Sequence, residues 1–404
     1  MLIMSEKRCE KLVCVVNGLS LVPPVSGVGR VTLELSKRLF GDGSDWKPLY
    51  YYGYYSSRLM DLGGMNGGSE IKRLALRFVR SNYVIKSLAR KALNFYGHFR
   101  NSNATVYWEP NHVLLKHIRA RVTLLTIHDL SCVFYPQWHP KERLDFWESN
   151  FRRGVEKADM IVTVSDTIRK SVLEYTGLHE ERVAFIHNGV DHELFRPLPD
   201  ACLADFRARH NLPARFFLCV GSIEPRKNLK NLLVAWLSLP YRVRGECKLL
   251  LIANSGWKNE DIMKLITDGE ESGSVALIRD VASFDMPFYY GLAEVFLYLS
   301  FYEGFGLPPL EAMACGAPVL VSDIPVHREI LAGAAMYVSP SDASIIAERL
   351  EDLLINSPSA SGACERSLRA ALYSWDKSAA GYAAIMESLN EKSERMISCP
   401  PKRK

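Results

Sequence analysis

The amino-acid sequence predicts an α/β protein with two Rossmann-like domains, each built on a parallel sheet. Its 404 residues exceed the length that one hydrophobic core usually serves, and a hydrophobic content of 48% is enough for two cores. Short apolar strands also alternate with helical segments twice, before and after a proline-containing stretch at residues 191–213. Such alternation is typical of parallel sheets, and we expect the stretch between the two runs to be a linker.

The expected strands set the domain boundaries. The apolar runs lie at residues 11–17, 104–108, 122–127, 158–165 and 182–187 in the first half, and at residues 216–220, 248–253, 275–278, 295–299 and 319–321 in the second. We therefore expect a first domain over residues 1–198 and a second over residues 199–374. In the last segment, residues 375–404, we expect a helix through residue 389 that crosses back onto the first domain, and a frayed basic tail from residue 392.

A glycine loop follows the first expected strand. Residues 23–30 include Gly27 and Gly29 and lead into a helix with a repeating apolar face. Such a loop lets the main chain approach a ligand at a helix N-terminus, as in nucleotide sites. The alternative interpretation is that Gly27 and Gly29 form a tight turn without a role in ligand binding.

Two further features of the first half are candidates for local roles. His128 follows the strand at 122–127 directly, at the carboxyl edge where doubly wound sheets bind ligands, although a single histidine is more often structural. Ser165 is expected to cap a helix over residues 166–175, and Asn188-Gly189 is expected to form a turn.

The second half carries adjacent cations after its first strand. Arg226 and Lys227 lie in the sequence GSIEPRKN at residues 221–228, between a strand end and a helix. One forked donor and one point charge suit a diphosphate, whereas a plain surface charge pair is the alternative.

Residues 300–320, SFYEGFGLPPLEAMACGAPVL, are rich in glycine and proline. Glycines and prolines predict a loop and then a short helix over residues 308–315 that ends at Gly316. Glu303 lies in the loop and Glu311 in the first helical turn, beside an N-terminus that favours an anion, so hydroxyl recognition is indicated. These groups would face Gly27, Gly29 and His128 across a cleft between the two halves.

Charge and cysteine usage narrow the class of protein. A net charge of +5 is too small to indicate nucleic acid, and the nine scattered cysteines without a CxxC pair favour a reduced cytosolic protein. No apolar run approaches the roughly 20 residues of a membrane span. Between Glu70 and Arg100 basic and apolar residues interleave, which fits an amphipathic helix on an anionic membrane surface or a solvated helical face.

The chain resembles the retaining glycosyltransferases of family 4, which have the GT-B fold of two Rossmann-like domains facing each other across a cleft. Within that family it resembles bacterial mannosyl- and D-rhamnosyltransferases of O-antigen and lipopolysaccharide assembly. The motifs that carry the resemblance are SGVGR at 26–30, TIHDL at 126–130, IHNGVD at 186–191, GSIEPRKN at 221–228 and EGFGLPPLE at 303–311.

The resemblance implies roles for individual residues. Glu303 would bind hydroxyls of the donor sugar, Glu311 the nucleotide ribose, and Arg226 and Lys227 the diphosphate, while His128 would lie near the reacting face of the sugar. The other donor-binding positions that it implies are Gly27, Gly29, Ser222, Val281, Gly304, Phe305, Gly306 and Leu307. Many relatives carry Arg where this chain has Ser222.

The resemblance also implies the reaction. A hexose, mannose or D-rhamnose, would pass from a GDP-sugar to a polyprenyl-diphosphate-linked or other glycan acceptor at the cytoplasmic face of the cell membrane, where the protein would be peripheral. Retention without a protein nucleophile is expected, although Glu303 as a nucleophile is an alternative. No Asp-x-Asp is present, so no metal or other cofactor is expected. A UDP- or dTDP-sugar enzyme with another acceptor, and a non-catalytic scaffold subunit, are the alternatives.

Overall fold

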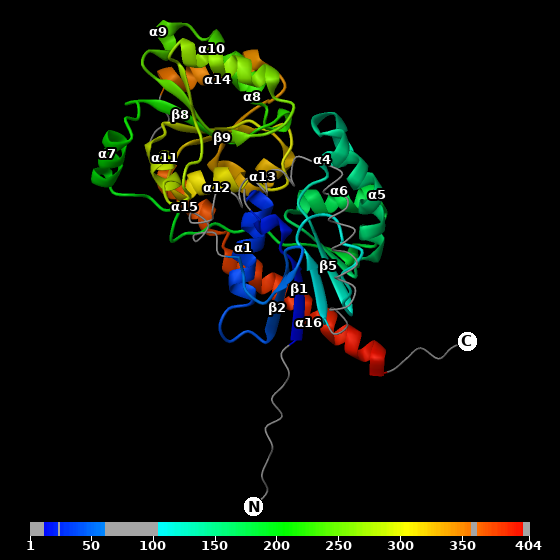
Figure 1. The fold of residues 1–404 in the computed structure, drawn as a ribbon. Coiled ribbons are helices and arrows are strands. Elements are labelled where there is room, and N and C mark those ends of the chain that lie inside the picture. The colour runs from blue at the N-terminus through cyan, green and yellow to red at the C-terminus, as the bar shows by residue number, and fades with distance from the viewer. Residues whose placement is uncertain (1–11, 23–24, 61–103, 357–361, 399–404) are drawn as a thin grey trace, which may run out of the picture.

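The computed structural model describes residues 12–22, 25–60, 104–356 and 362–398. Two α/β domains lie one above the other, and the C-terminal helix returns from the second domain to the first (Figure 1). Both domains are built on sheets of mainly parallel strands. The predicted fold class is therefore confirmed.

The first domain contains a seven-stranded sheet in the described part of the chain, with the order β3-β2-β1-β4-β5-β6-β7. Only the β2–β3 pair is antiparallel. The strands are β1 (Leu12–Asn17), β2 (Trp46–Tyr51), β3 (Tyr55–Ser56), β4 (Val106–Glu109), β5 (Val122–Ile127), β6 (Met160–Thr163) and β7 (Val183–Phe185). The helices are α1 (Gly27–Leu39), α4 (Ser131–Phe134), α5 (Lys141–Lys157) and α6 (Asp166–Thr176), with short helical turns η1 (Leu19–Leu21), η3 (Pro136–Trp138) and η4 (Glu180–Arg182).

The second domain contains a six-stranded, all-parallel sheet with the order β10-β9-β8-β11-β12-β13. The strands are β8 (Phe216–Ile223), β9 (Lys248–Ser255), β10 (Val275–Ile278), β11 (Val295–Tyr298), β12 (Val319–Ser322) and β13 (Met336–Val338). The helices are α8 (Leu229–Ser238), α9 (Tyr241–Arg244), α10 (Glu260–Glu271), α11 (Met286–Leu292), α12 (Leu307–Ala314), α13 (Pro325–Leu331), α14 (Ala343–Ile355) and α15 (Ala363–Ala371), with η5 (Pro225–Lys227) and η6 (Ala332–Ala334).

Both faces of the second sheet are buried, which explains its continuous apolar strands. Phe216 and Leu218 pack into one core cluster with α11 and α12, whereas Phe217 and Cys219 pack into another with α8 and α14. A strand that is buried on both faces loses the polar alternation of a half-exposed strand. Apolar runs therefore located β8 to β12 correctly, but the three-residue β13 was not predicted.

The stretch at residues 191–213, expected as a linker, contains helix α7 (Asp200–Arg209). Phe206 of α7 is buried and stacks on Phe288 of α11 with ring centroids 4.5 Å apart. Residues 200–209 therefore pack as part of the second domain.

Helix α16 (Trp375–Ser398) crosses onto the first domain, as predicted. Trp375, Tyr382 and Met386 are buried in the same cluster as residues of β1 and α1. The hydroxyl oxygens of Tyr382 and of Thr126 in β5 lie 3.0 Å apart. The helix runs through Ser398, so the tail is not frayed from residue 392.

Asn188-Gly189 does not form the predicted turn. Val190 instead bridges to Ser374, just before α16. A Cβ on Gly189 would lie 2.1 Å from the main-chain nitrogen of Trp375. The glycine is therefore explained by the crossing of two chain segments.

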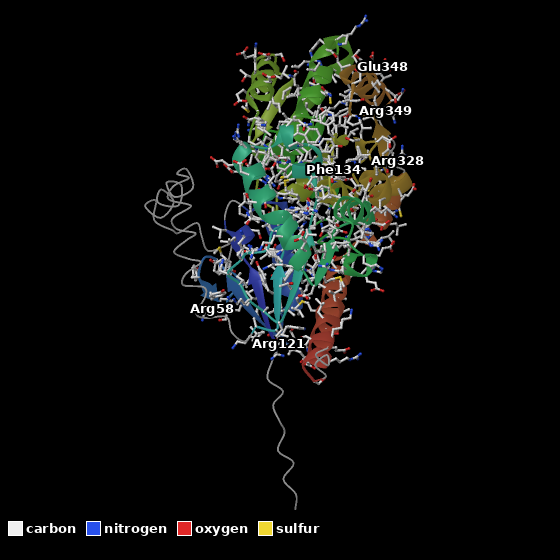
Figure 2. All side chains as sticks on the ribbon, turned by 90° about the vertical axis from the view of Figure 1, so that its right-hand side faces the viewer. Arg58, Arg121, Phe134, Arg328, Glu348 and Arg349 are labelled. Carbon is white, nitrogen blue, oxygen red and sulfur yellow. The ribbon has the colours of Figure 1, made fainter. Side chains whose placement is uncertain are left out.

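The carboxyl ends of the first sheet point toward the second domain. Arg121, which precedes β5, lies at the far end of the first domain in Figure 2, while Arg328 and Arg349 lie on the second domain. Parallel strands meet at the same sheet edge, so the loops after β1, β4, β5 and β6 face the second domain.

The predicted basic amphipathic stretch between Glu70 and Arg100 lies outside the described residues. None of the described helices combines the length and the apolar character needed to cross a bilayer.

Candidate functional site

Glu303 lies at the domain interface, in the loop between β11 and α12, with two cations on its carboxylate. Nη1 of Arg226 lies 2.8 Å from Oε2 of Glu303, and Nζ of Lys227 lies 2.6 Å from Oε1. The carboxylate is only 7% exposed. The structure therefore brings three of the predicted catalytic residues into direct contact.

The positions of the two cations follow from the chain after β8. Turn η5 holds Arg226 and Lys227 and ends at Asn228, whose φ of 57° lets the chain enter α8. The side-chain amide of Asn228 donates to the carbonyls of Leu299 (2.9 Å) and Pro340 (2.8 Å). These bonds fix η5 beside the end of β11.

Arg226 and Lys227 also have other partners. Nη2 of Arg226 donates to Glu224 at 3.0 Å and Nη1 to the carbonyl of Tyr302 at 2.9 Å, while Lys227 donates to the hydroxyl of Tyr298 at 2.6 Å. A binding diphosphate would therefore share or replace carboxylate contacts of these cations.

Electrostatics keep Glu303 and Arg226 ionised, whereas burial lowers the pKa of Lys227. Burial alone would raise the pKa of Glu303, but the charges of Arg226 and Lys227 outweigh it and lower that pKa to about 2. Burial likewise opposes the charge of Arg226, but Glu303 and Glu224 hold its pKa well above the ordinary value. Glu303 is thus an acceptor at neutral pH, suited to hydroxyl groups.

Helix α12 begins and ends close to the predicted positions. Gly306, with φ of 95°, precedes Leu307, and Gly316, with φ of 83°, follows the helix. Because the helix starts at Leu307, Glu311 falls just beyond the first turn in which it was expected.

Glu311 is paired across the domain interface. Oε2 of this buried carboxylate accepts from the hydroxyl of Tyr290 at 3.0 Å, and Oε1 lies 2.8 Å from Nη1 of Arg30. Arg30 comes from α1 of the first domain, and its guanidinium lies 5.1 Å above the ring of Phe195. Both oxygens of the predicted ribose-binding carboxylate therefore have partners.

Gly304 of the second domain and His128 of the first pack against each other. A Cβ on Gly304 would lie 1.8 Å from the carbonyl oxygen of His128. The carbonyl oxygen of Gly304 also accepts from the hydroxyl of Ser165 at 2.8 Å. The glycine is needed for domain packing as well as for its place in the loop.

The imidazole of His128 is neutral and anchored. Nε2 lies 2.8 Å from the carbonyl oxygen of Pro110, which can only accept, so Nε2 carries the proton. Burial lowers the pKa of His128. Among the described residues no partner of Nδ1 is found, so its lone pair is left for another group, and the main chain of His128 rather than its ring packs against the Glu303 loop.

The main chain of the Glu303 loop offers hydrogen-bond donors. Among the described residues, none accepts a hydrogen bond from the main-chain N–H of Gly304, Phe305, Gly306 or Leu307. The ring of Phe305 is buried in the core and packs on Tyr373. We therefore expect Phe305 to act through its main chain.

The predicted glycine loop is the first turn of α1. Ser26 caps this helix by accepting from the N–H of Gly29 at 3.4 Å. A Cβ on Gly29 would lie 2.2 Å from the carbonyl oxygen of Ser20, whereas the space around Gly27 is open. Packing against Ser20 therefore explains why residue 29 is a glycine. Of the two glycines, only Gly27 has space for the close approach of a ligand.

The last two predicted positions lie at the edge of the site. Ser222 is near the end of β8, in register with Asn254 of β9, and Val281 packs partly buried against the core cluster of α11 and α12. In the part of the chain that the structure describes, neither residue hydrogen-bonds to Glu303 or Glu311.

Several charged or polar residues of the site were not predicted, among them Arg30, Asp129, Glu224 and Tyr290. Burial alone would raise the pKa of Asp129, but the charge of Arg226 is the main influence that lowers it below its ordinary value. Asp129 and Arg30 directly follow the predicted residues His128 and Gly29, and Glu224 lies two residues before Arg226, so their positions in the sequence were a usable signal. The roles of Arg30 and Tyr290 depend on packing between distant elements.

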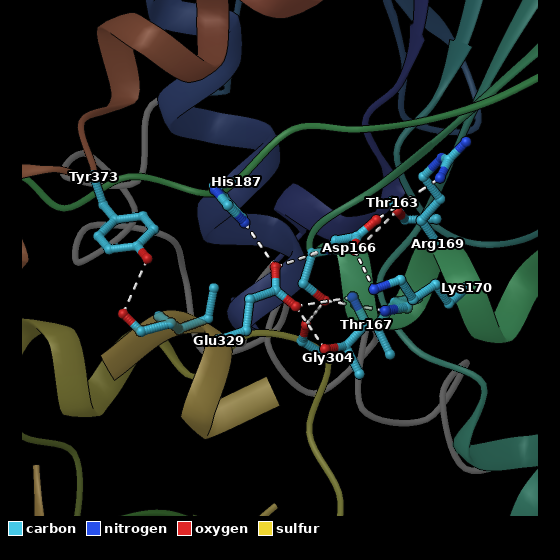
Figure 3. A network of polar contacts seen from close by, with 12 residues as sticks. Thr163, Asp166, Thr167, Arg169, Lys170, His187, Gly304, Glu329 and Tyr373 are labelled. Atoms are coloured by element: carbon cyan, nitrogen blue, oxygen red, sulfur yellow. Dashed lines mark hydrogen bonds and ion pairs between the residues drawn. The ribbon is translucent and has the colours of Figure 1, made fainter. Parts of the chain in front are cut away.

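Another carboxylate joins the two domains (Figure 3). Glu329 of α13 accepts from the main-chain N–H groups of Asp166 and Thr167, both at 2.8 Å, and lies 2.8 Å from Nε2 of His187. The second domain thus supplies an acceptor to the N-terminus of α6, next to Ser165.

Within the ranges that the structure describes, no three His, Cys, Asp or Glu side chains are grouped so that they could hold a metal ion.

Comparisons with known proteins agree with this two-domain arrangement. The family models "Glycosyltransferase Family 4" and "Glycosyl transferases group 1" match residues 25–194 and 204–367. The O-antigen chain mannosyltransferase B of Escherichia coli is 30% identical over 338 residues, which are 81% of this chain and 86% of that protein.

Two further proteins are similar. A GDP-mannose-dependent alpha-(1-6)-phosphatidylinositol monomannoside mannosyltransferase of Mycobacterium tuberculosis is 29% identical over 250 residues, 59% of this chain and 64% of that protein. The solved structure of a sucrose-phosphate synthase from Thermosynechococcus elongatus has a TM-score of 0.67 at 20% identity and covers 95% of this chain and 100% of its own. The second likeness concerns the fold alone.

Proposed function

Since the chain belongs to the glycosyltransferases of group 1 and family 4 and has the GT-B fold, we propose that it transfers a mannosyl residue from GDP-mannose to a lipid-linked glycan acceptor with retention of configuration. The names of two relatives support the choice of mannose and, in one case, of GDP-mannose and a lipid acceptor. GDP-D-rhamnose is the second donor to test.

The observation that carries the proposal is the contact of Glu303 with both Arg226 and Lys227 at 2.8 and 2.6 Å. A nucleotide-sugar has hydroxyl groups directly beside a diphosphate. One ionised acceptor between two cations matches that pattern, because the carboxylate binds hydroxyls while the cations bind phosphate oxygens.

The same groups would stabilise the transition state. As the bond between the anomeric carbon and the diphosphate oxygen breaks, negative charge grows on the leaving diphosphate, and Arg226 and Lys227 bind it more strongly than in the ground state. The free N–H groups of Gly304 to Leu307 would add donors at the same place. No metal ion is proposed, because these donors supply the positive charge.

Retention follows if the acceptor hydroxyl attacks from the face that the diphosphate leaves. The new bond joins the acceptor oxygen to the anomeric carbon, and the hydroxyl proton passes to the departing phosphate oxygen. Glu303, held by two cations with its pKa at about 2, is a weak nucleophile and a poor base, so we assign it to hydroxyl binding. His128 would offer the Nδ1 lone pair to a sugar hydroxyl.

We place the acceptor on the first domain and the reaction at the cytoplasmic face of the cell membrane, where the protein would be peripheral. The basic stretch between Glu70 and Arg100 supports this location through its composition. Sedimentation with anionic liposomes tests it, and binding that does not fall with salt would contradict it.

The purified full-length protein should release GDP from GDP-mannose in the presence of a polyprenyl-diphosphate oligosaccharide and not in its absence. NMR of the product should show the α linkage of the donor. Turnover of a UDP- or dTDP-sugar instead would correct the donor, a β linkage would overturn retention, and no turnover of any of these donors would overturn the enzymatic function.

A further inference from the structure

Among the described residues of the first domain, Arg30 is the one that forms an ion pair with Glu311. It lies in the first turns of α1, three residues after Gly27, and reaches Glu311 of α12 in the second domain. Figure 1 shows the N-terminal end of α1 directed toward α12. The pair therefore spans the two halves of the proposed donor site.

The ribose role of Glu311 conflicts with this pair. Oε2 already accepts from Tyr290 and Oε1 faces Arg30 at 2.8 Å, so ribose hydroxyls gain a place on Oε1 only when Arg30 moves or shares it. The side chain of Arg30 is 29% exposed while that of Glu311 is 6% exposed. Arg30 is thus the partner that can move.

A displaced Arg30 would need another anion. A half-buried guanidinium without a counter-charge is costly, and the ring of Phe195 compensates only in part. The ribose of a nucleotide-sugar is bonded to its diphosphate, so an anion arrives together with the hydroxyls. Guanidinium groups bind phosphate through the same forked geometry as carboxylate.

The start of α1 also suits an anion. Among the described residues, no acceptor is found for the main-chain N–H groups of Gly27 and Val28, and the space beside Gly27 is open. A helix N-terminus carries partial positive charge. An anion near Arg30 would therefore meet these donors as well.

We propose that Arg30 is a further donor-binding residue. When the ribose of the donor binds to the carboxylate of Glu311, Arg30 moves away from that carboxylate and binds the diphosphate instead. This inference rests on the proposed function, because it requires a nucleoside diphosphate in the site. Through this change of partner, both domains contact the donor. Arg30 then contributes to recognition of the diphosphate and not of the nucleoside.

Calorimetric titration with GDP, GMP and guanosine tests this change of partner. In Arg30→Met we expect GDP to bind about tenfold to a hundredfold more weakly, the usual loss for a hydrogen bond to a charged group, while guanosine binds at least as tightly as to wild type because Glu311 is free. Arg30→Lys should restore part of the preference for GDP over guanosine. Glu311→Gln should weaken guanosine binding and keep that preference.

The matched control is Arg38→Met, on the same helix but paired with Glu34 and Asp376, and it should behave as wild type. A wild-type preference for GDP over guanosine in Arg30→Met would overturn the inference, because Arg30 would then be an interdomain contact only. Tighter GDP binding in Arg30→Met would overturn it too. Wild-type protein that binds none of GDP, UDP, dTDP or ADP would overturn the proposed function and this inference with it.

Discussion

The main chain of Gly304 in the second domain packs against the carbonyl of His128 in the first so closely that a Cβ would lie 1.8 Å from that oxygen. Glu303 precedes this glycine, and the strand β5 ends just before His128. The contact therefore couples the position of the Glu303 carboxylate to the closure of the two domains.

Gly304→Ala should open this contact and lower transfer. The added methyl group meets the main-chain carbonyl of His128, which cannot swing away as a side chain can, so the domains must shift. A displacement of about 1 Å in an active site costs roughly 100-fold in rate. We expect kcat to fall by about that factor, measured with GDP-mannose as donor, while circular dichroism stays as in wild type.

Gly333→Ala is the matched control, because no atom lies within 4 Å of its Cβ position. It should keep the wild-type rate. Wild-type kcat in Gly304→Ala would show that the domains do not need this contact during turnover.

Glu303→Gln should separate sugar recognition from nucleotide binding. The amide keeps the size of the side chain but no longer neutralises Arg226 and Lys227, so we expect kcat to fall about 100- to 1,000-fold while the Kd for GDP stays the same or decreases. Rate assays and calorimetry measure the two effects. Glu294→Gln, which loses only a surface ion pair with Arg215, is the control.

Equal losses of GDP affinity and of kcat in Glu303→Gln would contradict the assignment of Glu303 to the sugar.

Lys227→Ala should weaken binding of the diphosphate. The ammonium lies 2.6 Å from both Glu303 and the hydroxyl of Tyr298, so its removal takes a buried cation from the site. We expect the Kd for GDP to rise about 10- to 100-fold, with a much smaller change for guanosine. Lys230→Ala, three residues further along the chain at the start of α8 and exposed, should bind GDP as wild type does. Unchanged GDP binding in Lys227→Ala would remove this lysine from the site.

Local sequence rules predicted much of the fold. Gly306, Pro308 and Gly316 located α12 to within one residue, because glycine and proline start and end helices through their own backbone conformations. The same rules missed β2, because Pro48 lies inside the aromatic sequence WKPLYY and proline argues against a strand. They also missed β3 and β13, which have two and three residues and are too short for a periodic signal.

The sequence brought site residues together where they follow neighbouring strands of one sheet. Glu303, Arg226 and Lys227 do meet, since parallel strands β8 and β11 are neighbours and end at one edge. The pairing of Arg30 with Glu311 and the packing of Gly304 on His128 depend on how the domains dock. No local sequence pattern encodes that geometry. The sequence also assigned Gly29 to ligand binding, whereas the close approach of the Ser20 carbonyl explains why a glycine is needed there.

A buried histidine beside the site links stability to pH. His112 is 7% exposed, its ring lies 5.3 Å from that of His128, and burial lowers its pKa from the ordinary 6.5 to about 3. The nearby charge of Asp129 acts in the opposite direction and does not offset burial. In the unfolded chain this histidine takes up a proton below pH 6.5, while the folded protein excludes it until about pH 3.

The free energy of unfolding should therefore fall as the pH decreases through 6.5, and His112 alone should contribute a loss of about 2 kcal/mol at pH 5. His112→Asn removes the titrating ring and suits the φ of 57° at this position, because asparagine tolerates left-handed backbone. Urea unfolding between pH 7.5 and 5 should show a shallower decline in this variant than in wild type or in the exposed control His179→Asn. The same decline in all three proteins would mean that His112 is protonated in the folded state.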